Sequence, residues 1–151
     1  MKFVIQRVKE AGVDIEGQTV GRIGRGYMVL LGACDTDDED IARKMVKKMM
    51  GLRIFADAEG KTNLSLTDVD GEILIVSQFT LYADCKKGNR PSFVKAGDPG
   101  HAKEIYEFVL RLIEEEYKIK PESGEFGADM QVSLINDGPF TIVLDSEQIC
   151  R

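Results

Sequence analysis

The chain has 151 residues, a formal net charge of −6 at pH 7, and 43% hydrophobic and 30% charged residues. This length suits one domain over residues 1–151 with a substantial buried core, and the composition excludes a disordered chain. The acidic charge argues against indiscriminate nucleic-acid binding, so we expect no DNA partner, and any RNA partner must meet a local basic patch.

The apolar runs of the chain are short. The longest, residues 27–31 and 73–76, cannot cross a bilayer, and the N-terminus MKFVIQRVKE lacks the apolar region of a signal peptide. We therefore expect a cytoplasmic protein that does not contact a membrane. Cys34, Cys85 and Cys150 have no C-x-x-C spacing, so we interpret them as unpaired thiols.

The first third of the chain predicts a β-meander. Residues 1–8 alternate like a strand, residues 13–23 are typical of a hairpin that turns at Glu16-Gly17, and residues 27–33 are typical of a buried strand. GRIGRG, residues 21–26, lies between predicted strands and does not open a helix, so its glycines are interpreted as turn and bend residues.

Two helices are predicted. The first begins at the acidic residues 35–40, and its apolar residues follow at helical spacing up to Gly51. The second is capped by Asp98, has Pro99 at its first position and ends near Tyr117.

The remaining residues are assigned to strands and loops. Residues 52–56 are assigned to a strand, 57–71 mostly to a loop, and 72–82, which end in SQFTLY, to a strand covered on both faces. Residues 128–145 are expected to return as two strands around INDGPF, as in a hairpin.

Familiar catalytic machinery is missing from the sequence. His101 is the only histidine, and its position predicts an exposed residue in the first turn of the second helix. One histidine and scattered carboxylates give no recognisable zinc set, although a carboxylate site for magnesium stays open. If the protein is an enzyme, its substrate must already be reactive, and the protein must act by positioning and main-chain hydrogen bonds. An aminoacyl ester on RNA meets this description.

Three segments carry a family resemblance: GKTNLSLTDVDGEILIVSQFTLYADCKKGNRPSF, FGADMQVSLINDGPFTIVLDS and the N-terminal QRV. Together they resemble the D-aminoacyl-tRNA deacylase family, from Met1 to about Ser146, and the signatures are SQFTL and N-x-G-P-x-T. Two positions depart from the family pattern. Phe140 stands where the family usually has valine, and Cys85 replaces a usual threonine.

The resemblance implies a homodimeric enzyme, without metal or cofactor, that hydrolyses the ester between a D-amino acid and the acceptor end of tRNA. It implies an α+β fold of mixed, mainly antiparallel, barrel-like sheet with two principal helices. In the family the Gly-Pro peptide is cis and enters the pocket of the opposite subunit as a chirality screen. The screen would be Gly138 and Pro139, and the catalytic pocket would comprise Ser77, Gln78, Phe79 and Thr80.

Further residues take supporting roles by the same resemblance. Arg7 would brace the Gly-Pro loop through hydrogen bonds, with Asn136 as a second support. The phosphates of the tRNA end would meet Lys86, Lys87 and Arg90, near Lys95. A second basic group on the first helix is interpreted as a solvated face and comprises Arg43, Lys44, Lys47 and Lys48.

Plainer interpretations remain open on spacing alone. The Gly-Pro segment fits a simple hairpin turn with Pro139 at the first residue of a strand, SQFTLY fits a plain strand, and Arg7 fits an exposed strand charge. The sequence alone does not establish a cis isomer.

A screen built from main-chain carbonyls would reject an L side chain by collision and admit glycine, so glycyl-tRNA is also an expected substrate. We prefer attack by water, assisted by the terminal ribose 2′-hydroxyl, with Thr80 in a positioning role. The N–H groups of Gln78, Phe79 or Thr80 would stabilise the oxyanion. The alternatives are a small-ester hydrolase that uses Thr80 as nucleophile and a non-catalytic module that binds a tRNA end or a nucleotide.

Overall fold

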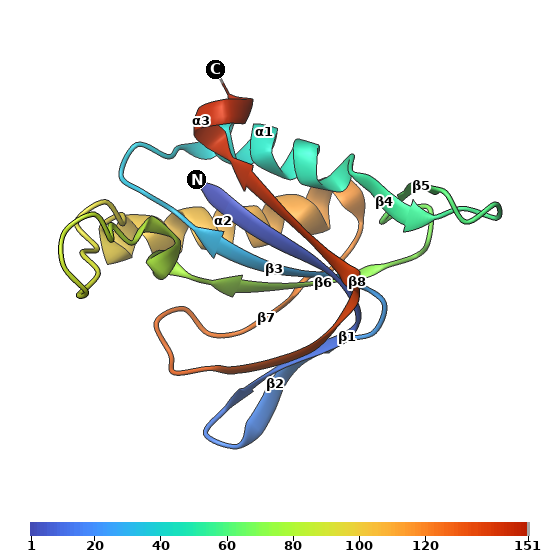
Figure 1. Cartoon of the computed structure of the whole chain (residues 1–151), viewed down its shortest axis with the longest axis horizontal. Helices are drawn as coiled ribbons and strands as arrows, with labels where there is room; N and C mark the ends of the chain where they lie inside the picture. Colours follow the sequence, from blue (N-terminus) through green and yellow to red (C-terminus); the bar gives the residue numbers. More distant parts are fainter. Residues whose placement is uncertain (151) are drawn as a thin grey trace.

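The computed structural model describes residues 1–150, and its central strand is β1 (Lys2–Ile15) (Figure 1). β1 pairs antiparallel with β2 (Gln18–Ile23), β3 (Gly26–Gly32) and β8 (Gln131–Asp145). β6 (Glu72–Ser77) runs parallel to β3, and β7 (Glu122–Ser123) runs parallel to β6. The order β2-β1-β3-β6-β7, with β8 against β1, confirms a mixed, mainly antiparallel and barrel-like sheet.

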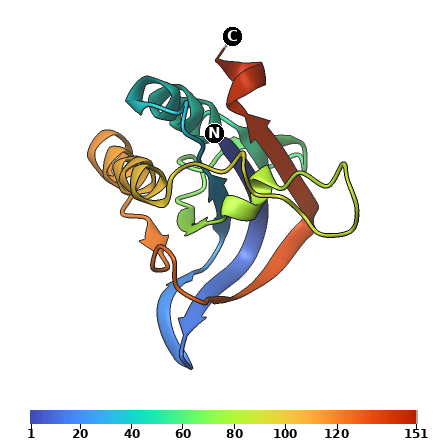
Figure 2. The ribbon, with the colours of Figure 1, turned by 90° about the vertical axis from the view of Figure 1, so that its left-hand side faces the viewer.

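The strands β3 and β6 are covered on both faces. Along β6, Ile73 and Ile75 belong to the core that contains helix residues, whereas Leu74 and Val76 belong to a second core with Val8 of β1. Figures 1 and 2 show α1 and α2 together on one face of these strands, with β2 and the first half of β8 curling around the other. An apolar run without alternation predicts this two-sided burial.

The two longer helices begin where local capping rules place them. Asp38 caps α1 (Glu39–Met50) by accepting a hydrogen bond from the Ile41 N–H, 2.8 Å away. Asp98 caps α2 (Pro99–Tyr117) by accepting from the N–H groups of Gly100 and His101. Both helices were predicted, and α2 ends at the expected residue. A short third helix, α3 (Ser146–Ile149), was not predicted.

Two strand predictions were wrong in their extent. β1 does not end near residue 8 but runs on to Ile15, with register shifts after Gln6 and after Val8. The segment 57–71 is mostly loop, as predicted, and it also contains the short strand β5 (Thr62–Ser65), which pairs antiparallel with β4 (Arg53–Ala56). The strand predicted over residues 72–82 ends at Ser77, and a short 3₁₀ helix, η1 (Phe79–Tyr82), follows it.

The predicted hairpin around Gly138-Pro139 is also wrong. Asn136 pairs with Val8 and Thr141 pairs with Gln6, so both halves of β8 run antiparallel to the same strand and the chain does not reverse. Residues 137–140 lie opposite Arg7 alone and leave the ladder as a bulge.

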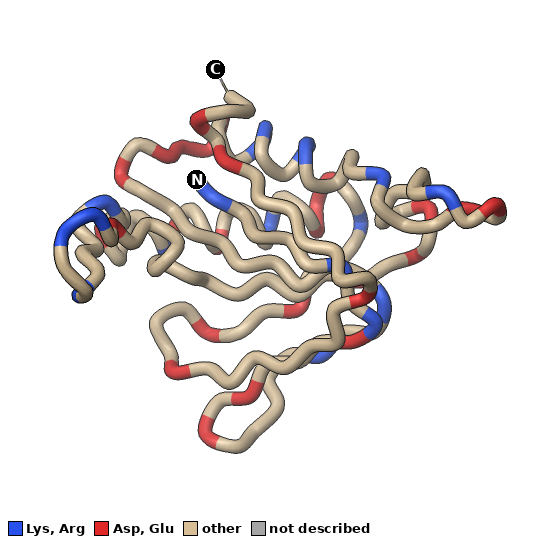
Figure 3. Tube along the Cα trace, in the orientation of Figure 1, with Lys and Arg blue, Asp and Glu red and all other residues tan. Residues whose placement is uncertain are grey.

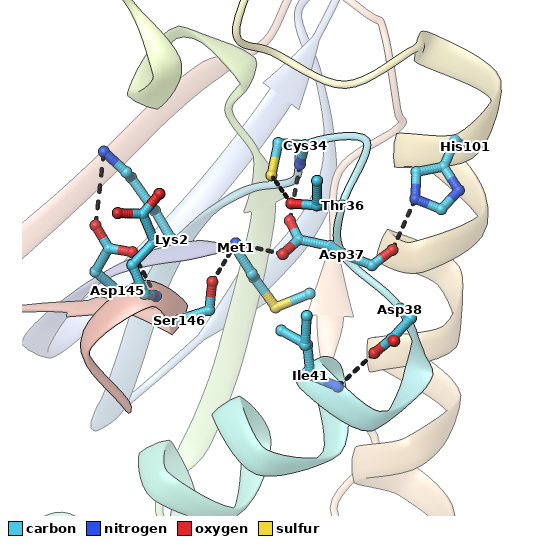
Figure 4. A network of polar contacts seen from close by, with 11 residues as sticks. Met1, Lys2, Cys34, Thr36, Asp37, Asp38, Ile41, His101, Asp145 and Ser146 are labelled. Carbon is cyan, nitrogen blue, oxygen red and sulfur yellow. Dashed lines mark hydrogen bonds and ion pairs between the residues drawn. The ribbon is translucent and has the colours of Figure 1, made fainter. Parts of the chain in front are cut away.

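Buried polar contacts join β1 to the helices (Figure 4). The Met1 ammonium donates to Asp37 Oδ1 at 2.5 Å and to Ser146 Oγ at 2.7 Å. Asp37 Oδ2 accepts from the Cys34 N–H, and the Asp37 carbonyl lies 2.8 Å from Nε2 of His101. His101 is therefore half-buried and bonded, not exposed as predicted. No helix within residues 1–150 is both long enough and apolar enough to span a bilayer.

Candidate active site

A pocket of about 620 Å³ opens where β6 ends, beside the first turn of α2. Ser77, Gln78 and Phe79 line it, as the resemblance implied. Figure 2 shows η1 and the yellow loop that leads into α2 on the side of the molecule that carries this pocket. The remaining lining residues are Leu31, Ala33, Val76, Phe93, Ala96, Gly97, Pro99, Ala102, Phe126, Gly127, Ala128, Met130 and Val132.

The main chain turns away from the sheet directly after Ser77. The Gln78 N–H still donates to the Leu31 carbonyl of β3, at 2.7 Å, so it is not free to bind an oxyanion. From Gln78 on, the chain coils, because the Leu81 N–H donates back to the Gln78 carbonyl. The first N–H groups of a helix have no acceptor within the helix. Among residues 78–80, the main-chain N–H groups that remain available to bind an oxyanion are therefore those of Phe79 and Thr80.

Thr80 is exposed and follows the three pocket-lining residues in the chain. Its hydroxyl accepts a hydrogen bond from Nε2 of the Gln78 side chain, at 2.5 Å. An amide cannot take up the proton of an attacking hydroxyl. His101 directs Nε2 at the Asp37 carbonyl. The Gln78 side chain therefore orients the Thr80 hydroxyl, and neither Gln78 nor His101 is placed to act as its base.

η1 is held in place by its last residue. Burial raises the pKa of the Tyr82 hydroxyl well above its ordinary range, so the phenol stays neutral. The Lys2 ammonium lies 5.1 Å from the centroid of the Tyr82 ring. The helix that follows the pocket wall is therefore tied to the start of β1.

Two aromatic rings flank the pocket. Phe79 and Phe93 pack edge to face with centroids 5.0 Å apart, yet they remain 56% and 38% exposed. Exposed rings of this kind offer surfaces on which nucleotide bases stack. The sequence did not predict Phe93, Phe126 or Met130 as pocket residues, although all three lie within the segments that carry the family resemblance.

The bulge of residues 137–140 is held by two side chains. Arg7 donates to the Asp137 carbonyl at 2.9 Å and to the Ile54 carbonyl at 2.6 Å, and its side chain is only 15% exposed. Asn136 accepts from the Phe140 N–H at 2.6 Å. The Gly138-Pro139 peptide bond is cis. Arg7 is therefore a half-buried brace of the bulge and not an exposed strand charge.

The bulge is not part of the pocket in this chain. Gly138 and Pro139 are exposed and do not belong to the described residues that line the pocket. Ser77 and Gly138 lie on strands separated by β3 and β1 in the sheet order. The structure thus brings Ser77, Gln78 and Phe79 together, and separately Arg7, Asn136, Gly138 and Pro139.

The predicted phosphate contacts lie on the loop between η1 and α2. Lys86, Lys87 and Arg90 are exposed there, and their loop forms the blue cluster at the left of Figure 3. The same loop returns through Phe93 to the pocket. Within residues 1–150 no group of three or more His, Cys, Asp or Glu side chains is arranged to hold a metal ion.

The fold and the pocket define an α+β protein with a pocket at the end of β6, where Ser77, Gln78 and Phe79 form part of the wall. Residues 4–145 match the family model described as D-Tyr-tRNA(Tyr) deacylase. The chain is 52% identical over 149 residues to a D-aminoacyl-tRNA deacylase of Thermosipho melanesiensis, which covers 99% of both chains. It is 58% identical over 145 residues to one of Lactobacillus acidophilus, which covers 96% of this chain and 99% of the relative. The chain belongs to the D-Tyr-tRNA(Tyr) deacylase family, which confirms the resemblance.

Two solved structures share this fold. A structure titled c-Myc DNA Unwinding Element Binding Protein is 42% identical, has a TM-score of 0.91 and covers 96% of this chain and 98% of its own. A probable eukaryotic D-amino acid tRNA deacylase, 20% identical with a TM-score of 0.79, covers 95% of this chain and 97% of its own and shares the fold.

Proposed function

We propose that this chain hydrolyses the ester bond between a D-amino acid, or glycine, and the acceptor end of tRNA, and that it spares L-aminoacyl-tRNA. The observation that carries the proposal is that the family segment SQFTL forms a wall of the pocket, through Ser77, Gln78 and Phe79. Relatives that are more than half identical over nearly the whole chain bear the name D-aminoacyl-tRNA deacylase.

In the proposed reaction a water molecule attacks the carbonyl carbon of the ester. The N–H groups of Phe79 and Thr80 donate to the oxyanion that forms, and one such donor contributes about 2.7–4 kcal/mol to transition-state stabilisation. The bond to the ribose 3′-oxygen then breaks, and this oxygen takes up a proton with the assistance of the neighbouring 2′-hydroxyl. Thr80, oriented by the Gln78 amide, positions the reacting groups.

In the proposed chirality screen two chains form a homodimer. Gly138 and Pro139 of one chain enter the pocket of the other, where their carbonyls hold the α-ammonium of the substrate. An L side chain would then collide with the carbonyls, whereas a D side chain points away and glycine has none. The bulge is exposed, braced by Arg7 and Asn136, and absent from the lining of the pocket in its own chain, and these features support an action on a second chain.

The tRNA end is proposed to bind through Lys86, Lys87 and Arg90. The net charge of −6 makes a general attraction for RNA weak, so a local basic loop beside the pocket is the source of phosphate contacts. These contacts position the ester and read few bases.

The proposal is tested with purified protein and a matched pair of D- and L-tyrosyl-tRNA, with ester loss followed in time. We expect the D-ester to be cleaved and the L-ester to persist at its uncatalysed rate. Equal cleavage of both would instead establish a general ester hydrolase. Binding of tRNA without cleavage of either would establish a non-catalytic module.

A further inference from the structure

The basic loop after η1 is closed at its base by a pair of residues, Asp84 and Ser92. Asp84 and Ser92 exchange two main-chain hydrogen bonds, Asp84 N–H to Ser92 O at 2.7 Å and Ser92 N–H to Asp84 O at 2.9 Å. The Asp84 carboxylate also accepts from the Lys86 N–H at 3.0 Å and lies 3.3 Å from the Lys95 ammonium. We call these four residues, Asp84, Lys86, Ser92 and Lys95, the Asp84 clip.

The Asp84 clip joins the cations to the pocket wall. Its N-terminal residue, Asp84, comes two residues after the end of η1, and the Ala83 N–H between them donates to the Thr80 carbonyl of η1. Its C-terminal side continues into Phe93, which packs on Phe79 at the pocket, and then into Gly97, whose N–H donates to the Ala33 carbonyl at the end of β3. Both ends of the basic loop are thus fixed to elements that line the pocket.

We infer that Asp84 is a positioning residue for the RNA substrate. It holds residues 85–91 so that Lys86, Lys87 and Arg90 stand beside the pocket mouth before tRNA arrives. This inference rests on the proposed function. A loop that is ordered in advance loses less conformational entropy on binding, so the clip strengthens binding of the RNA phosphates without touching the ester.

A purely electrostatic role for Asp84 predicts the opposite effect of its removal on tRNA affinity. Asp84 carries a negative charge among cations, so its removal would make the loop more positive and would tighten its hold on phosphates. The Asp84–Lys95 ion pair is exposed and contributes little by itself. The sign of the effect of Asp84→Ala on tRNA affinity therefore separates a positioning role from an electrostatic one.

The test measures the dissociation constant of uncharged tRNA and the kinetics on D-tyrosyl-tRNA for the parent and Asp84→Ala. We expect both the dissociation constant and KM to rise about three- to ten-fold, with kcat unchanged within about two-fold. Asp84→Asn keeps an acceptor for the Lys86 N–H and is expected to show a smaller rise. Glu59→Ala, which removes the carboxylate of the exposed Lys61 pair on another loop, is the matched control and is expected to show no rise.

Two further measurements make the result specific. In a Lys86→Ala/Lys87→Ala background, Asp84→Ala is expected to lose most of its effect, because few cations remain to be positioned. On adenosine esterified with D-tyrosine, which has no phosphate, Asp84→Ala is expected to match the parent. Unchanged or tighter tRNA binding by Asp84→Ala, or an equal defect on the phosphate-free ester, would overturn the inference. Failure of the proposed function looks different, because the parent itself would then either leave both D-esters intact or cleave L-tyrosyl-tRNA as fast as D-tyrosyl-tRNA.

Discussion

The guanidinium of Arg7 lies over the ring of Phe140, with Cζ 4.5 Å from the ring centroid. The same guanidinium donates to the Asp137 and Ile54 carbonyls, so one side chain ties the bulge to β1 and β4. A cation–π contact of this kind contributes about 0.5–2 kcal/mol, and the valine that the family resemblance leads us to expect at this position could not make it. The departure at Phe140 therefore adds a contact to the support of Gly138-Pro139.

Substitution of Gly138 tests this crowded geometry. Gly138 has φ +149°, and a Cβ atom there would lie 2.8 Å from the Phe140 nitrogen and 3.3 Å from Nη2 of Arg7. We predict that Gly138→Ala displaces the bulge and lowers the rate of D-tyrosyl-tRNA cleavage at least ten-fold, about 1.4 kcal/mol of activation free energy. Gly60→Ala is the control, because Gly60 has φ +77° with open space around it. Parent-like activity of Gly138→Ala would argue against a role for the bulge.

Thr80 separates a positioning role from a nucleophilic one. Loss of one neutral hydrogen bond costs about 0.5–1.5 kcal/mol, so Thr80→Ala is expected to lower kcat by roughly two- to ten-fold. Mass spectrometry of the parent, quenched during turnover, is expected to show no acyl group on the protein. An acyl-enzyme in the parent that is absent from Thr80→Ala would establish covalent catalysis.

The buried pair between the Met1 ammonium and Asp37 predicts a large effect on stability. Both groups are almost fully buried, with exposed side-chain fractions of 0% and 1%. Asp37→Asn leaves a buried ammonium without its counter-charge, so we expect the free energy of unfolding to fall by about 3 kcal/mol. Urea denaturation measures this change. Glu59→Gln, in an exposed pair with Lys61, is expected to change stability by less than about 1 kcal/mol.

Salt dependence identifies which basic cluster meets the RNA. Lys86→Ala/Lys87→Ala is expected to weaken tRNA binding and to flatten the dependence of log Kd on log salt concentration by about 0.7–0.9 per lost phosphate contact. Lys44→Ala/Lys47→Ala on α1 removes the same charge elsewhere and is expected to leave the slope unchanged. The reverse pattern would move the RNA-binding surface to α1.

Helix starts and tight turns, which residues adjacent in sequence determine, were predictable from the sequence. Asp98 followed by Pro99 defines a helix start without reference to the rest of the fold, and Glu16-Gly17 defines a tight turn in the same way. These elements were predicted at the right place because their hydrogen bonds close within a few residues.

Features decided by distant partners were missed. FTLY consists largely of good strand formers, yet β3 ends at Gly32, so no neighbour remains to pair with residues beyond Gln78 and the chain coils into η1. The Asn136–Thr141 segment has turn chemistry, but β1 offers partners on both sides of it. The pocket was missed in part because residues from separate segments line it, and apolar side chains such as Met130 look like core in a sequence.

The proposed main-chain wall rejects substrates by collision with their side chain, and one methyl group suffices to test it. Glycyl-, D-alanyl- and L-alanyl-tRNA, prepared on one tRNA, are incubated with the protein and their ester loss is followed. We predict that the glycyl and D-alanyl esters are cleaved while the L-alanyl ester survives at its uncatalysed rate. Cleavage of L-alanyl-tRNA as fast as glycyl-tRNA would contradict it.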